Sequence, residues 1–254
     1  MAQFNIDENG HCVIPIGTTE IGDNAFMNCD SLKSVEIPDS VTHIGISAFR
    51  NCRNLLSVKI PNWVESIGMG AFLDCVSLQS IKIPDSVTHI GHWTFCGCSS
   101  LQSIEIPGSV SEIGIGAFSN CSDLQTIEVS QDNEHFMSKN NSLLSKNGSI
   151  LLFGCKTSAI PDCVTRIRIS AFYKCESLQS IVIPGKVKSI ELDAFYGCSS
   201  LQSIEVSPDN ECFMSRNNCL LSKDGTILLR GCRTSVIPDS VTRIEDSAFD
   251  GCCI

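Results

Sequence analysis

Residues 37–52, IPDSVTHIGISAFRNC, hold the repeat that decides the fold. The Ile-Pro pair recurs every 23 residues at positions 14, 37, 60, 83 and 106, and returns at 160, 183 and 237. Val-Ser takes its place at 129 and 206. These ten positions enclose seven repeats of 23 residues and two of 31, and each repeat is called a rung below. A period of this length is typical of a solenoid in which every rung is one structural unit.

Each rung follows the pattern LxxIxIPxxVxxIGxxAFxxC. The alternation in LxxIxI predicts a half-buried strand, which the proline ends because it cannot donate a ladder hydrogen bond. VxxIG predicts a second short extended segment. The spacing in GxxAFxxC predicts one helical or 3₁₀ turn. Each rung is therefore expected to contain two short strands and a compact turn.

A single rung has nothing to pack its apolar side chains against, so burial requires stacking. Parallel strands about 4.8 Å apart place each Leu, Ile and Phe on its equivalent in the next rung. Burial of a large apolar side chain contributes about 1.5 to 3 kcal/mol, most of it offset by the entropy of ordering. Stability then depends on contacts between neighbouring rungs, and the terminal rungs are the weakest.

The two long rungs, 129–160 and 206–237, match each other closely. Each has a Leu-Leu pair, then Lys-Asn-Gly or Lys-Asp-Gly, then an Ile-Leu-Leu run, which predicts a β-hairpin with a type I′ turn. Residues 1–13 resemble the end of such a rung and are interpreted as an N-terminal cap. We expect residues 1–254 to form a single solenoid domain.

The pattern IPxSVTxIGxxAFxxC, seen at 37–52 and again at 237–252, resembles the BspA-like leucine-rich repeats over residues 13–252. The resemblance implies a right-handed, curved leucine-rich repeat solenoid, rich in short parallel strands. It also implies a surface or secreted protein that binds host matrix proteins or other cells. Residues 1–15 lack the features of a signal peptide, so a cytoplasmic location is the alternative.

Composition excludes several classes of protein. The formal charge of −10 and the absence of a Lys/Arg-rich block argue against nucleic-acid binding. No run of about 18 apolar residues predicts a transmembrane segment. Sixteen cysteines without a signal peptide favour a reducing compartment over a disulfide framework.

Eight cysteines share the position after Ala-Phe, namely Cys29, Cys52, Cys75, Cys98, Cys121, Cys175, Cys198 and Cys252. A metal or redox ladder is one interpretation, and a column of small buried thiols is the favoured one. Equivalent Cβ atoms near 4.8 Å apart exceed the usual disulfide separation, so free thiols are predicted. Cys155 and Cys232 are interpreted as structural, and Cys212, Cys219 and Cys253 as the most exposed thiols.

The sequence contains no GxSxG, no phosphate loop and no histidine-centred constellation, so no catalytic, cofactor-binding or metal-binding residue is predicted. Residues 89–98, HIGHWTFCGC, invite a zinc interpretation. The repeat register directs His89, His92, Cys96 and Cys98 in different directions, which disfavours a site. Trp93, with Trp63 one rung earlier, is instead interpreted as a possible contact patch.

The outward face of the first strand is the best candidate for a binding surface. A concave solenoid face made in this way can bind an extended partner. Its predicted members form a hydroxyl stripe beside a charged stripe: Ser34, Glu36, Ser57, Lys59, Ser80, Lys82, Ser103, Glu105, Thr126, Glu128, Ser203 and Glu205. As one alternative, the charges form ion pairs between neighbouring rungs, Glu36 with Lys59 and Lys82 with Glu105. As another, the partner binds at the hairpin tips near Lys146 and Lys223.

These patterns predict a non-enzymatic protein-interaction or adhesion solenoid whose partner is a protein or a surface glycan. The alternatives are a structural spacer or scaffold segment of a larger surface protein and a small intracellular scaffold. Partner identity and oligomeric state do not follow from the sequence.

Overall fold

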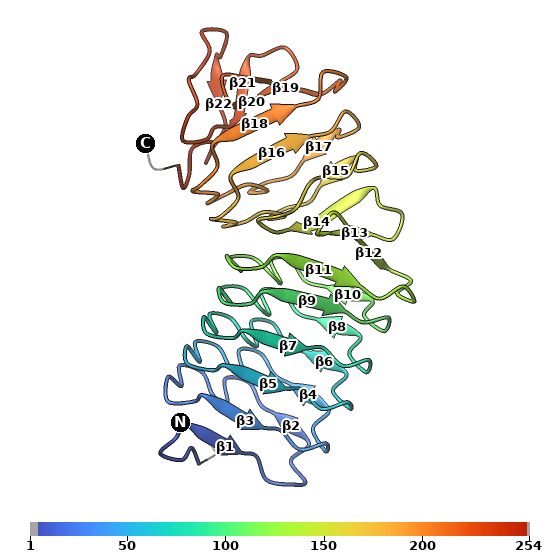
Figure 1. The fold of residues 1–254 in the computed structure, drawn as a ribbon, viewed down its shortest axis with the longest axis vertical. Helices are drawn as coiled ribbons and strands as arrows, with labels where there is room; N and C mark the ends of the chain where they lie inside the picture. The colour runs from blue at the N-terminus through green and yellow to red at the C-terminus, as the bar shows by residue number, and fades with distance from the viewer. Residues whose placement is uncertain (1–4, 253–254) are drawn as a thin grey trace. The chain divides into compact units, whose positions relative to one another are not determined.

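A computed structural model describes residues 5–252 (Figure 1). The chain separates into two compact units, Met1–Met137 and Ser138–Ile254. Each unit is described by itself below. Both consist of stacked rungs with short strands, and residues 5–252 contain no helix.

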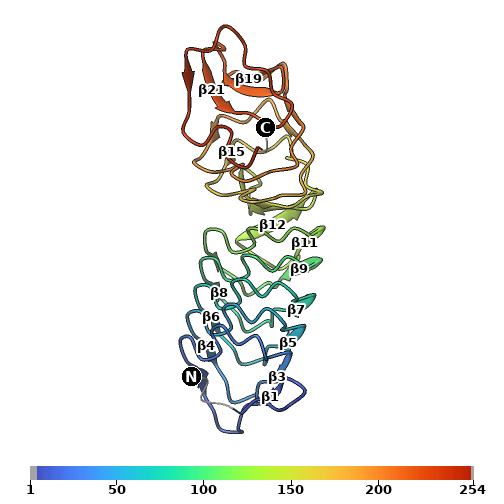
Figure 2. The ribbon, with the colours of Figure 1, turned by 90° about the vertical axis from the view of Figure 1, so that its left-hand side faces the viewer.

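The first unit carries two columns of parallel strands (Figure 2). One column contains β1 (His11–Val13), β3 (Ser34–Glu36), β5 (Ser57–Lys59), β7 (Ser80–Lys82), β9 (Ser103–Ile106) and β11 (Thr126–Val129). The other contains β2 (Glu20–Ile21), β4 (His43–Ile44), β6 (Ser66–Ile67), β8 (His89–Ile90) and β10 (Glu112–Ile113). Equivalent residues pair across rungs, as Ser57 does with Ser34 and with Ser80. The predicted solenoid with two strands per rung is confirmed.

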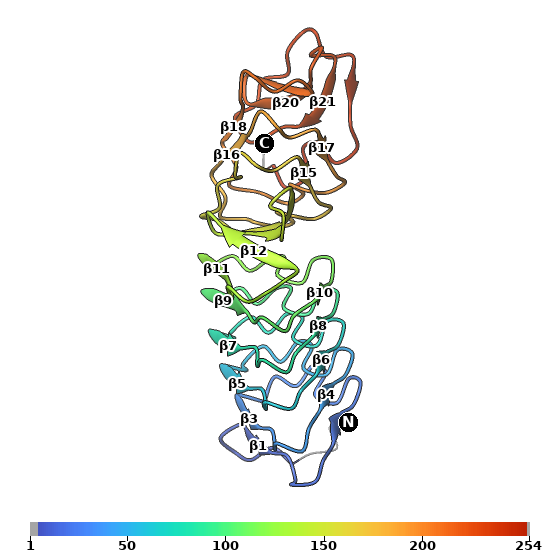
Figure 3. The ribbon, with the colours of Figure 1, turned by 90° about the vertical axis from the view of Figure 1, so that its right-hand side faces the viewer.

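β12 (Phe136–Lys139) crosses the boundary between the units. The second unit contains β13 (Ser142–Ser145), β14 (Ile150–Gly154), β15 (Arg166–Ile167), β16 (Ser180–Ile183), β17 (Ser189–Ile190), β18 (Ser203–Val206), β19 (Phe213–Arg216), β20 (Cys219–Ser222), β21 (Ile227–Arg230) and β22 (Arg243–Ile244) (Figure 3). Strands β19, β20 and β21 pair in antiparallel fashion, and β21 pairs in parallel with β22. The long rung 206–237 therefore adds a small antiparallel meander, β19–β21, to the parallel stack.

Phenylalanine rings form the centre of the first unit's core. Phe26, Phe49, Phe72, Phe95 and Phe118 stack in turn, with centroids 5.0 to 5.7 Å apart and ring planes within 7°. All five are fully buried. In the second unit Phe172 and Phe195 stack at 5.3 Å. The repeat thus buries each apolar position on its own copy, as stacking requires.

The GxxAFxxC segment does not form the predicted helical or 3₁₀ turn. Alternate amides leave the rung: the Ser47 and Phe49 N–H groups donate to the Met69 and Ala71 carbonyls of the next rung. The Cys52 N–H donates within its own rung, to the Phe49 carbonyl. Ser47 also has a φ of +54°, which a right-handed helix excludes. Stacking captures half of the amides, so the segment forms linked turns.

The glycine of the VxxIG segment allows the rungs of the first unit to approach closely. A Cβ atom built on Gly68 would lie 2.7 Å from the Gly45 carbonyl carbon. One on Gly91 would lie 2.6 Å from the Met69 nitrogen. In the second unit Glu191 and Glu245 occupy this position of the repeat.

The predicted hairpins are present, but their turns differ from the prediction. Gly148 has a φ of +72° and its N–H donates to the Ser145 carbonyl. Lys146 and Asn147 lack the positive φ that type I′ needs, so the Asn-Gly turn is a type I turn followed by a left-handed glycine. Two consecutive positive φ values occur instead at Asn217 and Asn218, between β19 and β20. An Asn-Asn pair therefore forms the type I′ turn.

The expected N-terminal cap uses the same kind of turn. The Gly10 N–H donates to the Asp7 carbonyl, and Gly10 has a φ of +83°. Ile6 then bridges Cys12 in antiparallel fashion. Residues 1–4 of the cap lie outside the described residues.

Two buried asparagines hold the long rungs. Asn210 is fully buried, and its Nδ2 donates to the Pro184 and Val187 carbonyls at 2.8 and 3.0 Å. Its Oδ1 accepts from the Cys212 and Phe213 amides at 2.8 and 2.7 Å. Asn133 makes the equivalent four bonds in the first unit. Each amide thereby satisfies its full hydrogen-bonding capacity.

Candidate functional site

The strand face is the outward side of β3, β5, β7, β9 and β11 in the first unit. Along each strand, the residues before and after the buried central one point outward, as Ser57 and Lys59 do on either side of Val58. Register places the hydroxyls of Ser34, Ser57 and Ser80 in one row and that of Ser103 beside Thr126, and contacts between β7 and β9 continue the row. Glu36, Lys59, Lys82, Glu105 and Glu128 form the second row, and all five are exposed.

The hydroxyls of this face differ from other hydroxyls of the same unit. Ser40, Ser86 and Ser109 each donate to a carbonyl one rung away at 2.6 to 2.7 Å, so these hydroxyls hold the stack together. Among residues 5–252, the hydroxyls of Ser57, Ser80, Ser103 and Thr126 form no such bond. Their donors and acceptors are available to a partner.

The charged row also lacks internal pairing. The alternative of neighbouring-rung ion pairs fails, because neither Glu36–Lys59 nor Lys82–Glu105 closes within 4.0 Å in the described part of the chain. Glu36 instead lies 3.6 Å from His11, whose Nδ1 is 2.7 Å from the Ser34 hydroxyl. Lys59, Lys82, Glu105 and Glu128 therefore face solvent without a salt bridge to residues 5–252.

In the second unit the corresponding face is smaller. β16 pairs with β18, so that Ser180 lies beside Ser203 and Val182 beside Glu205. Val182 is an exposed apolar residue at a position that is charged in each of β3, β5, β7, β9 and β11. Only Glu205 carries charge on this pair of strands.

The two tryptophans occupy different positions of the repeat. Trp63 lies between β5 and β6, at the position of the bonding serines Ser40 and Ser86, and is 66% exposed. Trp93 follows β8, has a φ of +56° and is half-buried. A Cβ atom on Gly116 would lie 2.3 Å from the Trp93 ring, so this indole covers the next rung. Trp93 has a packing role, and a contact patch shared with Trp63 stays a prediction.

The remaining residues of 89–98 have structural partners. His92 Nδ1 accepts from the Ile115 amide at 2.9 Å, and Thr94 donates to the Gly91 carbonyl at 2.8 Å. His89 is exposed on β8, 3.6 Å from Glu112. Within residues 5–252, no three His, Cys, Asp or Glu side chains are grouped so that they could hold a metal ion.

The described ladder cysteines are free thiols, as predicted. Five of these thiols donate to the phenylalanine carbonyl of the preceding rung, as Cys75 does to Phe49 at 3.1 Å; the others are Cys52, Cys98, Cys121 and Cys198. Burial raises the pKa of Cys52 and of Cys198 to about 12 and that of Cys75 still further. Cys155 and Cys232 are buried as well. The ladder is therefore a column of packed thiols.

One of the expectations for exposed thiols is wrong. Cys219 is fully buried, because it replaces Ser142 of the other long rung on an inward-facing strand. Cys212 is half-buried, and Cys253 lies outside the described residues.

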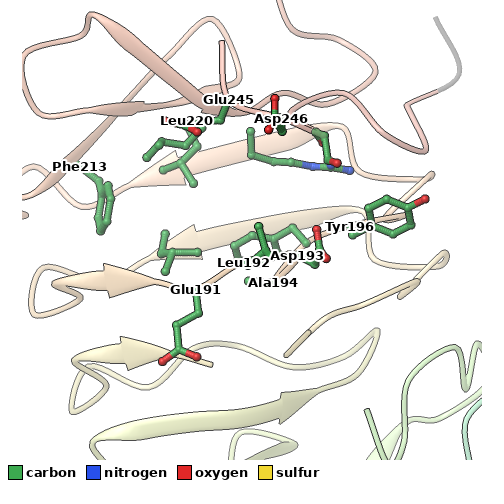
Figure 4. A pocket seen from close by; sticks show the side chains of 14 residues that line it. Glu191, Leu192, Asp193, Ala194, Tyr196, Phe213, Leu220, Glu245 and Asp246 are labelled. Atoms are coloured by element: carbon green, nitrogen blue, oxygen red, sulfur yellow. The ribbon is translucent and has the colours of Figure 1, made fainter. Parts of the chain in front are cut away.

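The second unit contains a cavity of about 320 Å³ that the sequence pattern did not reveal (Figure 4). It lies between residues 190–196 and 245–247, beside the β19–β21 meander. Leu192, Phe213 and Leu220 supply apolar walls, while Asp193 and Asp246 supply carboxylates. Glu191 points away, because its carboxylate accepts from the Ile169 amide at 2.9 Å and lies 3.6 Å from Arg166.

The polar groups of this cavity are carboxylates, hydroxyls and one guanidinium. Among the described residues that line it there is no histidine, cysteine or lysine, so Ser247 has no histidine or lysine partner there. Arg230 is 5% exposed and donates to the Ser247 and Asp250 carbonyls at 2.8 and 2.6 Å. This guanidinium joins the β19–β21 meander to the last rung and occupies the position of Phe153 in the other long rung.

The stacked two-strand rungs and the polar strand face define a leucine-rich repeat solenoid. The family model for the BspA type leucine rich repeat region matches residues 19–144 and 153–223, in six copies. The chain belongs to this family. Residues 5–252 include no helix that is long and apolar enough to span a bilayer.

Solved structures have the same fold. The pneumococcal vaccine antigen PcpA gives a TM-score of 0.74 at 22% identity over 98% of this chain, which spans 63% of the PcpA chain. A leucine rich cell surface protein of Faecalibacterium prausnitzii gives 0.53 at 28% identity, over 98% of this chain and 84% of its own. A leucine-rich repeat protein of Eubacterium ventriosum gives 0.59 at 23%, over 98% and 92%. No curated protein matches the chain.

We expect Trp63→Ser to stabilise the first unit slightly, by about 0.5 to 1.5 kcal/mol. A serine there can donate to a carbonyl one rung away, as Ser40 and Ser86 do. Urea denaturation measures the change. Ser86→Ala, which removes such a bond, serves as the control and is expected to shift stability in the opposite direction. A loss of stability in Trp63→Ser would show that the indole is needed for packing.

Proposed function

We propose that the protein is a non-enzymatic interaction module at a cell surface, which docks a partner protein on the strand face of the first unit. The unbonded hydroxyls of Ser57, Ser80, Ser103 and Thr126 carry this proposal, since hydroxyls elsewhere in the unit hold rungs together. Repeat proteins use such extended faces for binding. The charged row adds groups that steer a partner and select it.

Three further observations support this proposal. The family consists of repeats of a kind that commonly mediates protein binding, and PcpA and the Faecalibacterium protein are described as a vaccine antigen and a cell surface protein. Among the described residues that line the cavity of the second unit there is no Ser-His or Cys-His pair. Trp63, exposed beyond β5, adds an aromatic group of the kind enriched at protein interfaces.

The test measures binding of the full chain to a panel of purified, immobilised extracellular-matrix proteins. We expect Ser80→Tyr/Ser103→Tyr to abolish the binding, because two neutral rings then cover the hydroxyl row, while tyrosine is well tolerated in strands. Lys146→Tyr, at an exposed hairpin tip, is the matched control and retains binding.

If binding is lost only in Lys146→Tyr, the partner binds at the hairpin and the proposed strand-face site is refuted. Thermal denaturation of both variants confirms that they are folded. Failure of the wild-type chain to bind any protein of the panel would refute matrix adhesion as its role.

A further inference from the structure

The charges along the strand face are grouped by sign. From β5 to β11 the row contains Lys59, Lys82, Glu105 and Glu128, two positive charges followed by two negative ones. Lys59 lies directly beside Lys82, and Glu105 directly beside Glu128, in the parallel register. The part of the row from Lys59 to Glu128 is therefore a surface dipole aligned with the stacking direction. Glu36 lies on β3 beyond its positive end, 3.6 Å from His11.

This order does not serve the stability of the fold. Like charges directly opposite each other on neighbouring strands are destabilising, whereas alternating charges would attract. The two pairs of unlike neighbours, Glu36 with Lys59 and Lys82 with Glu105, form no ion pair within 4.0 Å among residues 5–252. Gln79 and Gln102, which precede Ser80 and Ser103, are exposed and uncharged. They therefore do not compensate the charges of the row.

We propose that the row of Lys59, Lys82, Glu105 and Glu128 binds an extended peptide segment in which two acidic residues are followed or preceded by two basic residues. The inference rests on the proposed function and specifies its partner. Acidic side chains of the peptide face the two lysines, basic side chains face the two glutamates, and backbone groups reach the hydroxyls of Ser57, Ser80 and Ser103. An anionic glycan would engage the lysines and be repelled by the glutamates.

The dimensions of an extended chain suit this row. Four rungs about 4.8 Å apart span about 14 Å, and four same-face residues of an extended peptide span about 20 Å. The excess is about 2 Å for each step. Lysine and glutamate side chains on both partners are long and flexible enough to cover it. Because either end of the peptide can meet the lysines, the grouping of the charges decides binding and the chain direction does not.

The experiment compares two synthetic peptides of equal composition in fluorescence anisotropy at low salt. Both place two glutamates and two lysines at alternate positions separated by glycine. The block peptide groups like charges, and the alternating peptide interleaves them. We expect the wild-type protein to bind the block peptide about tenfold more tightly, because two of the four charge contacts become repulsive with the alternating one.

Lys82→Glu/Glu105→Lys is the decisive variant. It keeps composition and net charge but converts the row to alternating charges, so the peptide preference is expected to reverse. Its melting temperature is expected to be unchanged or higher, since unlike charges now neighbour each other. Ser80→Tyr/Ser103→Tyr should lose both peptides.

The other outcomes separate this inference from the proposed function. Equal binding of both peptides by the wild-type protein, lost in Ser80→Tyr/Ser103→Tyr, would refute the charge order while leaving a binding face. Peptide binding that survives Ser80→Tyr/Ser103→Tyr would place the site elsewhere and refute the inference. Absence of peptide binding, or tighter binding of a sulfated oligosaccharide than of the block peptide, would also overturn it.

Discussion

Asn210→Asp is expected to lower the free energy of unfolding of the second unit by about 3 kcal/mol at pH 7. The change removes the Nδ2 donor from two buried carbonyls, Pro184 and Val187, and places a carboxylate oxygen against them. Leaving a buried polar group without a partner costs about 1 to 3 kcal/mol, and more for a charged group. The bonds from the Cys212 and Phe213 amides to Oδ1 can persist.

The expected loss depends on pH. A carboxyl buried against two carbonyls is favoured in its protonated form, so its pKa rises above that of the unfolded chain, about 3.9. The variant is therefore nearest to the wild type at pH 4 and below, and falls behind as the pH rises. Urea denaturation at pH 4 and 7 measures the difference, and hydrogen exchange at the Cys212 and Phe213 amides locates it.

Asn147→Asp is the matched control, because it makes the same chemical change at an exposed turn. Asn147 Oδ1 accepts from the Ser145 hydroxyl and from the Ser149 amide and hydroxyl. In the other long rung, Asp224 accepts the equivalent bonds from Ser222 and Thr226, which lower its pKa. No loss is expected at pH 7. Equal losses in Asn147→Asp and Asn210→Asp would refute the role of the buried amide.

The burial of the repeated apolar positions could be predicted from the sequence, because each rung packs directly against the next one. A residue such as Phe72 needs only its own copies, Phe49 and Phe95, to be buried, so period and burial coincide. The turns after Ala-Phe did not follow, because local spacing fits a helical turn equally well. Only the competing bonds to the next rung, such as Phe49 N–H to the Ala71 carbonyl, decide between the two.

The strand face followed from the sequence only in part, for the same reason. Alternation along a strand predicted which side of Ser57 and Lys59 faces outward, and the structure agrees. Whether Glu36 pairs with Lys59 or with His11 depends on side-chain placement, which no period encodes. The asparagines of the long rungs carried a signal in their recurrence after Val-Ser-x-Asp at 133 and 210. Their bonding role required the loop geometry.

Raising the pH from 8 to 10 is expected to destabilise the protein by several kcal/mol through the thiol ladder. Burial raises the pKa of five ladder thiols, namely Cys52, Cys75, Cys98, Cys175 and Cys198. In the unfolded chain each thiol ionises near its ordinary pKa of 9.0. The folded state keeps these protons while the unfolded state releases them. The free energy of unfolding is therefore unaffected below pH 9 and falls as the pH rises toward 12.

The size of the effect follows from proton linkage. One pH unit above the unfolded pKa, each thiol that stays protonated only in the folded state costs about 1.4 kcal/mol. Five such thiols amount to about 7 kcal/mol by pH 10, which is comparable to the whole stability of many domains. Urea denaturation at pH 7, 8, 9 and 10, under a reductant that keeps the thiols free, measures the loss.

Cys75→Ala separates this effect from general alkaline unfolding. The variant lacks the thiol's bond to the Phe49 carbonyl, so it starts at a lower stability at pH 7. It has one titrating thiol fewer, and is therefore expected to lose about 1.4 kcal/mol less than the wild type between pH 8 and 10. Cys163→Ala, outside the ladder and half-buried, should follow the wild-type profile. Only a thiol whose pKa differs between the folded and the unfolded state can couple folding to pH. If Cys75→Ala loses as much stability as the wild type between pH 8 and 10, ionisation of the ladder thiols does not cause the alkaline loss.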